Sequence, residues 1–367
     1  MDIDLRDYGL DPSALAEMGA APETAPGRVM EVHRDMYAVM TARGRVDARL
    51  KGAFVYEARE RGDLPCTGDF VLLRPNEGGA ARIVGLLPRR TKFSRADSSG
   101  HGYAHIKANR EQVVAANFDY VFILSSLNRD FNVNRILRYI AQSRQSGGLP
   151  VVLLTKADLS DGGGAQADEV LRVAPDVPVH AISSHTGQGM AALGAYLLPG
   201  KTAVFLGMSG VGKSSLLNAL AGDGLAKIGD VRAVDASKGS HTTTSRQLYM
   251  LPSGAMVIDT PGMRELGLFG VDEDAPEFGD IAALAASCRF GDCRHDREPG
   301  CAIRAALASG ELARARYELF LGHQRQASFS DDKAAYARER AKQYRDMEKS
   351  IRKQKKHFRR NAKTPTA

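Results

Sequence analysis

The sequence predicts a multidomain protein in which a small all-β barrel, a parallel α/β domain and a short helical region follow one another along 367 residues. Short apolar stretches separated by Gly, Pro and Asn fill the barrel region, and apolar strands alternate with helical segments in the α/β region. Three of the four cysteines gather in the helical region. We expect an N-terminal extension at 1–27, a barrel at 28–90 and a linker at 91–117. The α/β domain is expected at 118–274, a cysteine-bearing domain at 275–335 and a basic helix or tail at 336–367.

The barrel region has five candidate strands in about sixty residues, which suits a closed barrel of the OB type. The strands are expected at Arg28–His33, Tyr37–Thr41, Phe54–Ala58, Asp69–Arg74 and Arg82–Leu87. Another small β domain is the alternative. The extension before it is rich in Ala, Pro and acids, and a short helix is expected there at Pro12–Met18.

The α/β region begins where the polar, basic stretch 91–112, expected to be a linker or mobile loop, gives way to apolar strands. Strands are expected at Phe118–Ser125, Val151–Leu154, Val177–Ile182, Thr202–Leu206 and Ala255–Ile258, with helices at Val133–Ser143, Met190–Leu197 and Lys213–Ala221. Continuous apolar runs on strands are typical of a mostly parallel sheet covered on both faces. Ligands bind such sheets at the carboxyl ends of the strands.

A phosphate-binding loop follows one of these strands and opens a helix. Residues 207–214 read G-M-S-G-V-G-K-S and fit the pattern G-x-x-x-x-G-K-[ST]. The glycines let backbone N–H groups surround phosphates, and the helix N-terminus adds a positive dipole end. Lys213 would reach the β and γ phosphates, and Ser214 would hold magnesium. The expected nucleotide contacts of this loop are Gly207, Met208, Ser209, Gly210, Val211, Gly212, Lys213, Ser214 and Ser215.

The choice of base is indicated by Thr155-Lys156-Ala157-Asp158, which resembles the N-K-x-D motif of GTPases at the end of another strand. Asp158 would accept two hydrogen bonds from guanine, whereas adenine offers no such donor pair. Thr155 stands where Asn is usual and is shorter, so we expect weaker affinity with unchanged base choice. Ser183 and Ser184 resemble the second guanine-contacting motif, which alone is weak evidence.

Two switch motifs follow the phosphate loop. Asp259-Thr260-Pro261-Gly262 matches D-x-x-G, in which Asp259 would contact magnesium through water and the Gly262 N–H would face the γ phosphate. Residues 239–244, G-S-H-T-T-T, resemble a loop in which a threonine closes over magnesium; Thr243 is favoured, with Thr242 next. In ordinary GTPases the base motifs come last, but here they come first. The rotated order indicates a circularly permuted GTPase domain, which chains tolerate when the cut falls in exposed loops.

The cysteine-bearing region has the spacing Cys288-x4-Cys293-x-His295-x5-Cys301. Three thiolates and one imidazole are the preferred ligands of a closed, structural zinc site. In a reducing cytosol this clustering favours a metal over disulfides. The fourth cysteine, Cys66, is expected to be a small core residue.

The chain has a net charge of +7, and residues 342–363 hold ten Lys or Arg against two acids. A solvated tail and a nucleic-acid contact are equally consistent with this charge. No run is long enough to span a bilayer, and the N-terminus lacks a signal pattern, so we expect a cytoplasmic protein.

Together these motifs resemble the bacterial small-subunit-dependent GTPase family RsgA, also called YjeQ, over about residues 28–320. Three further stretches match the family: G-S-H-T-T-T against its G-R-H-T-T-T, D-T-P-G-M-R-E beginning at Asp259, and E-P-G-C ending at Cys301. This sequence departs from the family pattern at Thr155 and at Ser240. The resemblance implies a late maturation factor of the small ribosomal subunit, with GTP hydrolysis that is slow alone and stimulated by that subunit. It also implies that the barrel and basic C-terminal segment contact ribosomal RNA. We expect a monomer.

Met263 occupies the place where Ras-like enzymes have a water-orienting Gln, so slow unstimulated hydrolysis is expected. His241, in the switch loop, is the leading candidate to orient water; the expected catalytic set is His241, Lys213, Thr243 and Gly262. Candidate RNA contacts in the barrel are Arg28, His33, Arg34, Tyr37, Arg43, Arg45, Arg49 and Lys51. Three alternatives stay open: a permuted GTPase acting on the large subunit or another RNA, a non-hydrolysing nucleotide-gated RNA-binding module, and an ATP-dependent enzyme.

Overall fold

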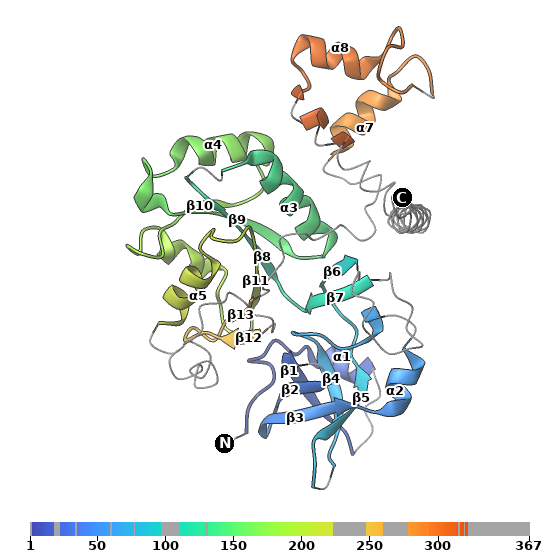
Figure 1. The fold of residues 1–367 in the computed structure, drawn as a ribbon, viewed down its shortest axis with the longest axis vertical. Helices are drawn as coiled ribbons and strands as arrows, with labels where there is room; N and C mark the ends of the chain where they lie inside the picture. Colours follow the sequence, from blue (N-terminus) through green and yellow to red (C-terminus); the bar gives the residue numbers. More distant parts are fainter. Residues whose placement is uncertain are drawn as a thin grey trace, which may run out of the picture. The chain divides into compact units, whose positions relative to one another are not determined.

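The computed structural model (Figure 1) divides into two compact units, Met1–Phe269 and Gly270–Ala367, which are described separately. The residues that it describes are 2–17, 23–33, 35–58, 61–76, 78–96, 111–128, 131–222, 247–259, 278–291, 293–314, 316–318 and 320–321. Of the residues expected to take part in catalysis or to hold magnesium, His241, Thr242, Thr243 and Gly262 lie outside these ranges, as does the basic segment expected at 336–367.

The first unit begins with the predicted five-stranded barrel. Its strands are β1 (Ala25–His33), β2 (Met36–Thr41), β3 (Gly44–Leu50), β4 (Phe70–Arg74) and β5 (Ala81–Leu86). They follow the order β1-β2-β3-β5-β4, and pairing of β1 with β4 closes the barrel. Its interior is filled by Val29, Tyr37, Val39, Ala48, Val71, Leu73 and Ile83. The OB-type barrel is therefore confirmed.

One barrel strand was placed wrongly from the sequence. Residues Gly52–Glu57 form helix α2, not a strand at Phe54–Ala58, and the third strand is β3. In β3 the exposed Arg45, Asp47 and Arg49 alternate with less exposed apolar residues, which is the period of a half-buried strand. Its high charge concealed that period.

The N-terminal extension is packed against the barrel. Helix α1 (Pro12–Glu17) forms where it was expected. Its apolar residues and the preceding Leu10 pack against a cluster formed by Phe70, Leu72 and Leu87. A short 3-10 helix, η1 (Arg61–Asp63), completes the connections between barrel strands.

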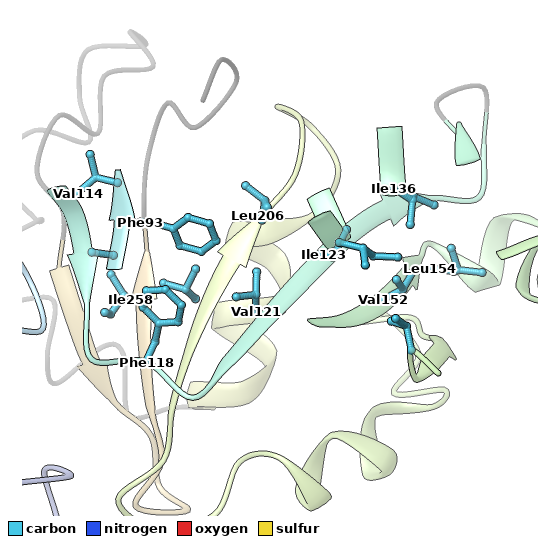
Figure 2. Packing of buried hydrophobic residues seen from close by; sticks show 14 of the residues in the cluster. Phe93, Val114, Phe118, Val121, Ile123, Ile136, Val152, Leu154, Leu206 and Ile258 are labelled. Atoms are coloured by element: carbon cyan, nitrogen blue, oxygen red, sulfur yellow. The ribbon is translucent and has the colours of Figure 1, made fainter. Parts of the chain in front are cut away.

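The expected linker 91–117 contains two paired strands, β6 (Lys92–Ala96) and β7 (Glu111–Ala116). Phe93 and Val114 are each 1 % exposed, and the Phe93 ring stacks on Phe118 with 4.9 Å between ring centroids. Figure 2 shows these side chains beside Ile258 and Val121 of the α/β domain. The ends of this stretch are thus part of the core, because each places apolar side chains among the polar ones.

The α/β domain is a six-stranded sheet in the order β10-β9-β8-β11-β13-β12, in which only β12 is antiparallel to its neighbour. The strands are β8 (Tyr120–Ser126), β9 (Leu149–Thr155), β10 (Val179–Ala181), β11 (Thr202–Leu206), β12 (Gln247–Met250) and β13 (Met256–Asp259). Helices α3 (Val133–Gln145) and α4 (Gly164–Val173) contribute to the core on one face. Helix α5 (Lys213–Ala221) and the 3-10 helix η3 (Met190–Ala195) contribute to the core on the other face of the sheet. Strand β12 and helix α4 were not predicted from the sequence.

The sheet of the α/β domain continues into the barrel. Strand β12 pairs antiparallel with β1, with Glu31 opposite Gln247. The barrel and the α/β domain therefore share one continuous sheet of eleven strands.

The second unit contains helices α7 (Gly279–Ala286) and α8 (Ala302–Ser309). A small core holds them together, formed by Phe278, Ile281, Cys301, Ile303, Ala306, Leu312, Tyr317 and Phe320. Within the described ranges of both units, no helix is long and apolar enough to cross a membrane.

Candidate functional site

The predicted nucleotide motifs meet at one edge of the sheet. Strands β8, β9, β11 and β13 run parallel, so their carboxyl ends lie side by side. The phosphate loop follows β11, the Thr155–Asp158 motif lies at the end of β9, and Asp259 ends β13. This edge is where open α/β sheets bind ligands.

The phosphate loop needs its glycines for steric reasons. A Cβ at Gly207 would lie 2.6 Å from the carbonyl oxygen of Leu124, and Gly210 and Gly212 have φ of +77° and +107°. Lys213, at the start of α5, directs its ammonium into the loop, where it donates to the carbonyls of Gly207 and Met208, at 2.7 Å each. Ser214 and Ser215 are exposed on the first turn of α5. The loop thus presents a cation, hydroxyl groups and a helix N-terminus, which together suit an anion.

Thr155 and Lys156 join the base motif to the phosphate loop. The Thr155 hydroxyl, on a residue 5 % exposed, donates to the Val211 carbonyl at 2.7 Å. The Lys156 ammonium donates to the Gly210 carbonyl at 2.9 Å, from a backbone with φ of +62°. The shorter threonine therefore still makes a bond between the two loops. The expectation of weaker affinity stays a prediction.

Asp158 is exposed beside Ser183, which is 1 % exposed after β10. The Ser183 hydroxyl lowers the pKa of the Asp158 carboxyl, and the charges of His185 and Lys156 lower it further. The same hydroxyl accepts the N–H groups of His185 and Thr186 at 3.2 and 3.1 Å, which fixes the Ser183–Ser184 turn. Asp158 is thus held as a carboxylate, the form that accepts hydrogen bonds from guanine.

His185 was missed from the sequence, although its place after the Ser183–Ser184 motif could have indicated it. Asp259 is half-buried and lies opposite Gln247 of β12. Its neighbours in the D-x-x-G motif and in the switch loop fall outside the described residues.

The four residues of the cysteine cluster converge in the second unit. Their ligand atoms all lie within 4.8 Å of one another. The Cys288 Sγ–Cys301 Sγ distance is 4.0 Å, and His295 Nδ1 lies 3.6 and 3.5 Å from these sulfurs. Zinc bound tetrahedrally at its usual bond lengths needs ligand separations of about 3.5 to 3.8 Å. The cluster could therefore hold a metal ion.

The first turn of α8 favours the thiolate of Cys288. The Arg304 N–H donates to Cys301 Sγ at 3.4 Å, so that Cys301 caps the helix. Burial acts to raise the pKa of the Cys288 thiol, but the N–H groups of Ala302 and Ile303 act against it, and the pKa lies below its ordinary value. A metal ligand must be deprotonated, so the environment of Cys288 fits a metal ligand, whereas burial raises the pKa of the Cys293 thiol to about 11.

Comparison with known proteins agrees with this geometry. The family model described as RsgA GTPase matches residues 86–269. The protein named "Small ribosomal subunit biogenesis GTPase RsgA 2" from Lactiplantibacillus plantarum is 41 % identical over 331 residues, which cover 90 % of this chain and 91 % of that protein. The chain belongs to the RsgA GTPase family. It is accordingly a GTP-hydrolysing enzyme.

Solved structures show the same architecture. The crystal structure of YjeQ from Thermotoga maritima is 26 % identical, with a TM-score of 0.59, covering 83 % of this chain and 98 % of that one. YloQ, described as a circularly permuted GTPase, is 22 % identical with a TM-score of 0.56, covering 84 % and 96 %. The predicted permuted fold is thus confirmed.

Two of the barrel residues proposed to contact RNA are wrong. Arg28 is 1 % exposed and Tyr37 is 4 % exposed, so neither presents its side chain at the surface. Aromatic and basic residues were taken as surface residues because the sequence alone does not reveal their buried partners. Among the described residues, the exposed members of that set are His33, Arg43, Arg45, Arg49 and Lys51, and Arg34 lies outside the described ranges.

Proposed function

We propose that the chain acts in late maturation of the small ribosomal subunit, and that this subunit stimulates its GTP hydrolysis. The observation that carries the nucleotide part is the bond between Thr155 and Val211, which holds the guanine motif against the phosphate loop. The subunit part is supported by the relative from Lactiplantibacillus plantarum, whose name includes small ribosomal subunit biogenesis.

In this proposal each loop has its own task. Asp158 selects guanine, helped by Ser183 and Ser184, while the backbone N–H groups of the phosphate loop and Lys213 bind the phosphates. Oxygen ligands suit magnesium, which Ser214, Asp259 and Thr243 or Thr242 would hold. When bound, magnesium neutralises charge on the β and γ phosphate oxygens. The Gly262 N–H would face the γ phosphate, and His241 would orient the attacking water.

The C-terminal cluster would hold one structural zinc ion, with Cys288, Cys293, His295 and Cys301 as ligands. Four protein ligands leave no open coordination position for catalysis. We further propose that the enzyme is a cytoplasmic monomer with the domain limits expected from the sequence, except that both ends of the expected linker 91–117 belong to the core of the first unit.

Contact with ribosomal RNA would involve the barrel and the basic C-terminal segment. A groove of about 1210 Å³ on the barrel is lined by Arg43, Arg49 and Arg82, among other residues. Glu23 and Asp47 also line it, so the groove is only weakly basic. Arginine in such a groove would bind phosphate groups of RNA without reading sequence.

The test is GTP hydrolysis by the purified protein alone, with small ribosomal subunits and with large subunits. Strong stimulation by small subunits alone is the expected result. Stimulation by large subunits, or by neither, would leave the GTPase site standing but would refute the small-subunit role. Measuring phosphate release over time gives the rates directly.

A further inference from the structure

Arg28 is a buried arginine that joins three segments of the first unit. Its Nη2 donates to the Asn117 carbonyl at 2.8 Å, and its Nε donates to the Gly68 carbonyl at 3.3 Å. Its Nη1 donates to the Tyr8 carbonyl. These carbonyls belong to the turn before β8, the turn before β4 and the N-terminal segment.

The environment of Arg28 is unusual for a structural arginine. Among the described residues no carboxylate lies within ion-pair distance of it, and its guanidinium lies 5.0 Å from the centre of the Phe70 ring. Burial, and next the charge of Arg90, lower the pKa of Arg28 to about 9, so the side chain is still charged at neutral pH. A buried charge that bonds to three carbonyls and one thioether sulfur, with no carboxylate of the described residues in ion-pair contact, is costly to place. This cost favours a role that a hydrophobic residue could not perform.

The fourth contact of Arg28 points to that role. Its Nη1 lies 3.2 Å from the Sδ atom of Met256, the first residue of β13. Strand β13 ends three residues later at Asp259, the candidate magnesium residue. The guanidinium thus reaches from barrel strand β1 to the strand that carries Asp259.

A second connection runs from the same barrel strand. Glu31 of β1 lies opposite Gln247 of β12, and Gln247 lies opposite Asp259. These three residues therefore form one row across three adjacent strands. Strands β12 and β13 form an antiparallel hairpin, and β1 contacts it at two places. The backbone of β1 pairs with β12 at Gln247, and the Arg28 side chain contacts β13 at Met256.

We propose that Arg28 is a positioning residue that fastens the barrel to strand β13 and thereby sets the position of Asp259. The proposal rests on the role of Asp259 given under Proposed function, but not on the small-subunit role. It makes the barrel part of the support of the nucleotide site. Residues that orient metal-binding groups from outside typically change metal affinity ten- to a hundredfold. Arg28 acts one step further away, so we expect roughly three- to tenfold.

The test compares Arg28→Met, Arg28→Lys and Met256→Leu with the wild-type protein. Met256→Leu keeps the volume of the β13 side chain and removes the sulfur. Met250→Leu is the matched control, since Met250 lies opposite Met256 on β12 and is not among the hydrogen-bond partners of Arg28 in the described part of the chain. Arg28→Lys keeps the charge and should therefore depart less from the wild-type protein than Arg28→Met does.

Two measurements decide the outcome. The first is hydrogen exchange of the amides of 247–250 and 256–259 in nucleotide-free protein, which should be faster in Arg28→Met and Met256→Leu than in the control. The second is the Mg²⁺ concentration that half-maximally slows release of a fluorescent GDP, which should rise about three- to tenfold in Arg28→Met. Release without Mg²⁺ should not change.

A wild-type Mg²⁺ midpoint and exchange pattern in Arg28→Met, with only a lower melting temperature, would overturn the proposal. If Arg28→Met does not fold, Met256→Leu decides in the same way against Met250→Leu. If the wild-type protein binds GDP without any influence of Mg²⁺, the proposed role of Asp259 fails, and the exchange measurement alone still shows whether Arg28 holds β13.

Discussion

Replacing Thr155 by Val tests the link between the base motif and the phosphate loop. Valine has nearly the shape of threonine but no hydroxyl, so the change removes the 2.7 Å bond to the Val211 carbonyl and little else. Thr155 is 5 % exposed, so water has little access to replace the bond. A buried hydrogen bond of this kind contributes about 1 to 1.5 kcal/mol.

That free energy corresponds to a loss of roughly five- to twelvefold in affinity. GTP and GDP should be weakened alike, because the bond lies between loops that both nucleotides would contact. Titration with fluorescent GDP and GTP analogues measures the two dissociation constants, and stopped-flow release should locate most of the change in the dissociation rate. Thr155→Ser keeps the hydroxyl and should remain within twofold of wild type, about 0.4 kcal/mol.

An affinity of Thr155→Val within twofold of wild type, with an unchanged melting temperature, would refute this reasoning. It would mean that the two loops keep their positions without the bond. Thr155→Asn adds a further comparison, since Asn is the residue usual at this position in the motif. A gain in affinity there would support the expectation that threonine weakens binding.

Four further outcomes are expected. Asp158→Asn should weaken GTP binding at least tenfold, because an amide cannot accept both guanine donors; equal loss of GTP and ATP binding would argue against base reading by Asp158. His241→Ala should depress stimulated turnover with near-normal GTP binding, and unchanged stimulated turnover would remove His241 from the mechanism. Cys301→Ser, or a strong chelator, should release zinc and lower the melting temperature of the second unit, as metal analysis and calorimetry would show. Removing residues 336–367 should weaken binding to small subunits and flatten its salt dependence, whereas an unchanged slope would indicate a tail that is only solvated.

The parts that the sequence predicted well are those with a local signal. The phosphate loop carries its own pattern, and Thr202–Leu206 and Lys213–Ala221 form the strand and helix expected around it. The cysteine cluster could likewise be predicted from the spacing of its residues along the chain alone. Its four ligand atoms meet as predicted because the two helices of the second unit enclose a short loop.

The parts that it predicted poorly depend on distant partners. Strand β3 was missed because its charged residues hid the alternation, and the strand at Phe54–Ala58 was wrong because a short apolar run fits a helix equally well. Arg28 was assigned to the surface from its residue type. Its burial depends on carbonyl groups of residues 8, 68 and 117, which are distant from one another in the chain. No local sequence pattern predicts that these groups contact Arg28.

The barrel has two attachments to the sheet of the α/β domain. The chain passes from the barrel through β6 and β7 into β8, in the middle of the sheet, while β1 pairs with β12 at its end. Without β1, β12 would be an edge strand with unpaired backbone groups. Strand β11, which leads into the phosphate loop, lies between these attachments, with β8 on one side and β13 and β12 on the other. A displacement of the barrel relative to the sheet must therefore distort a neighbour of β11 or break the β1–β12 pairing. For this reason a partner that binds the barrel has a direct physical route to the nucleotide site.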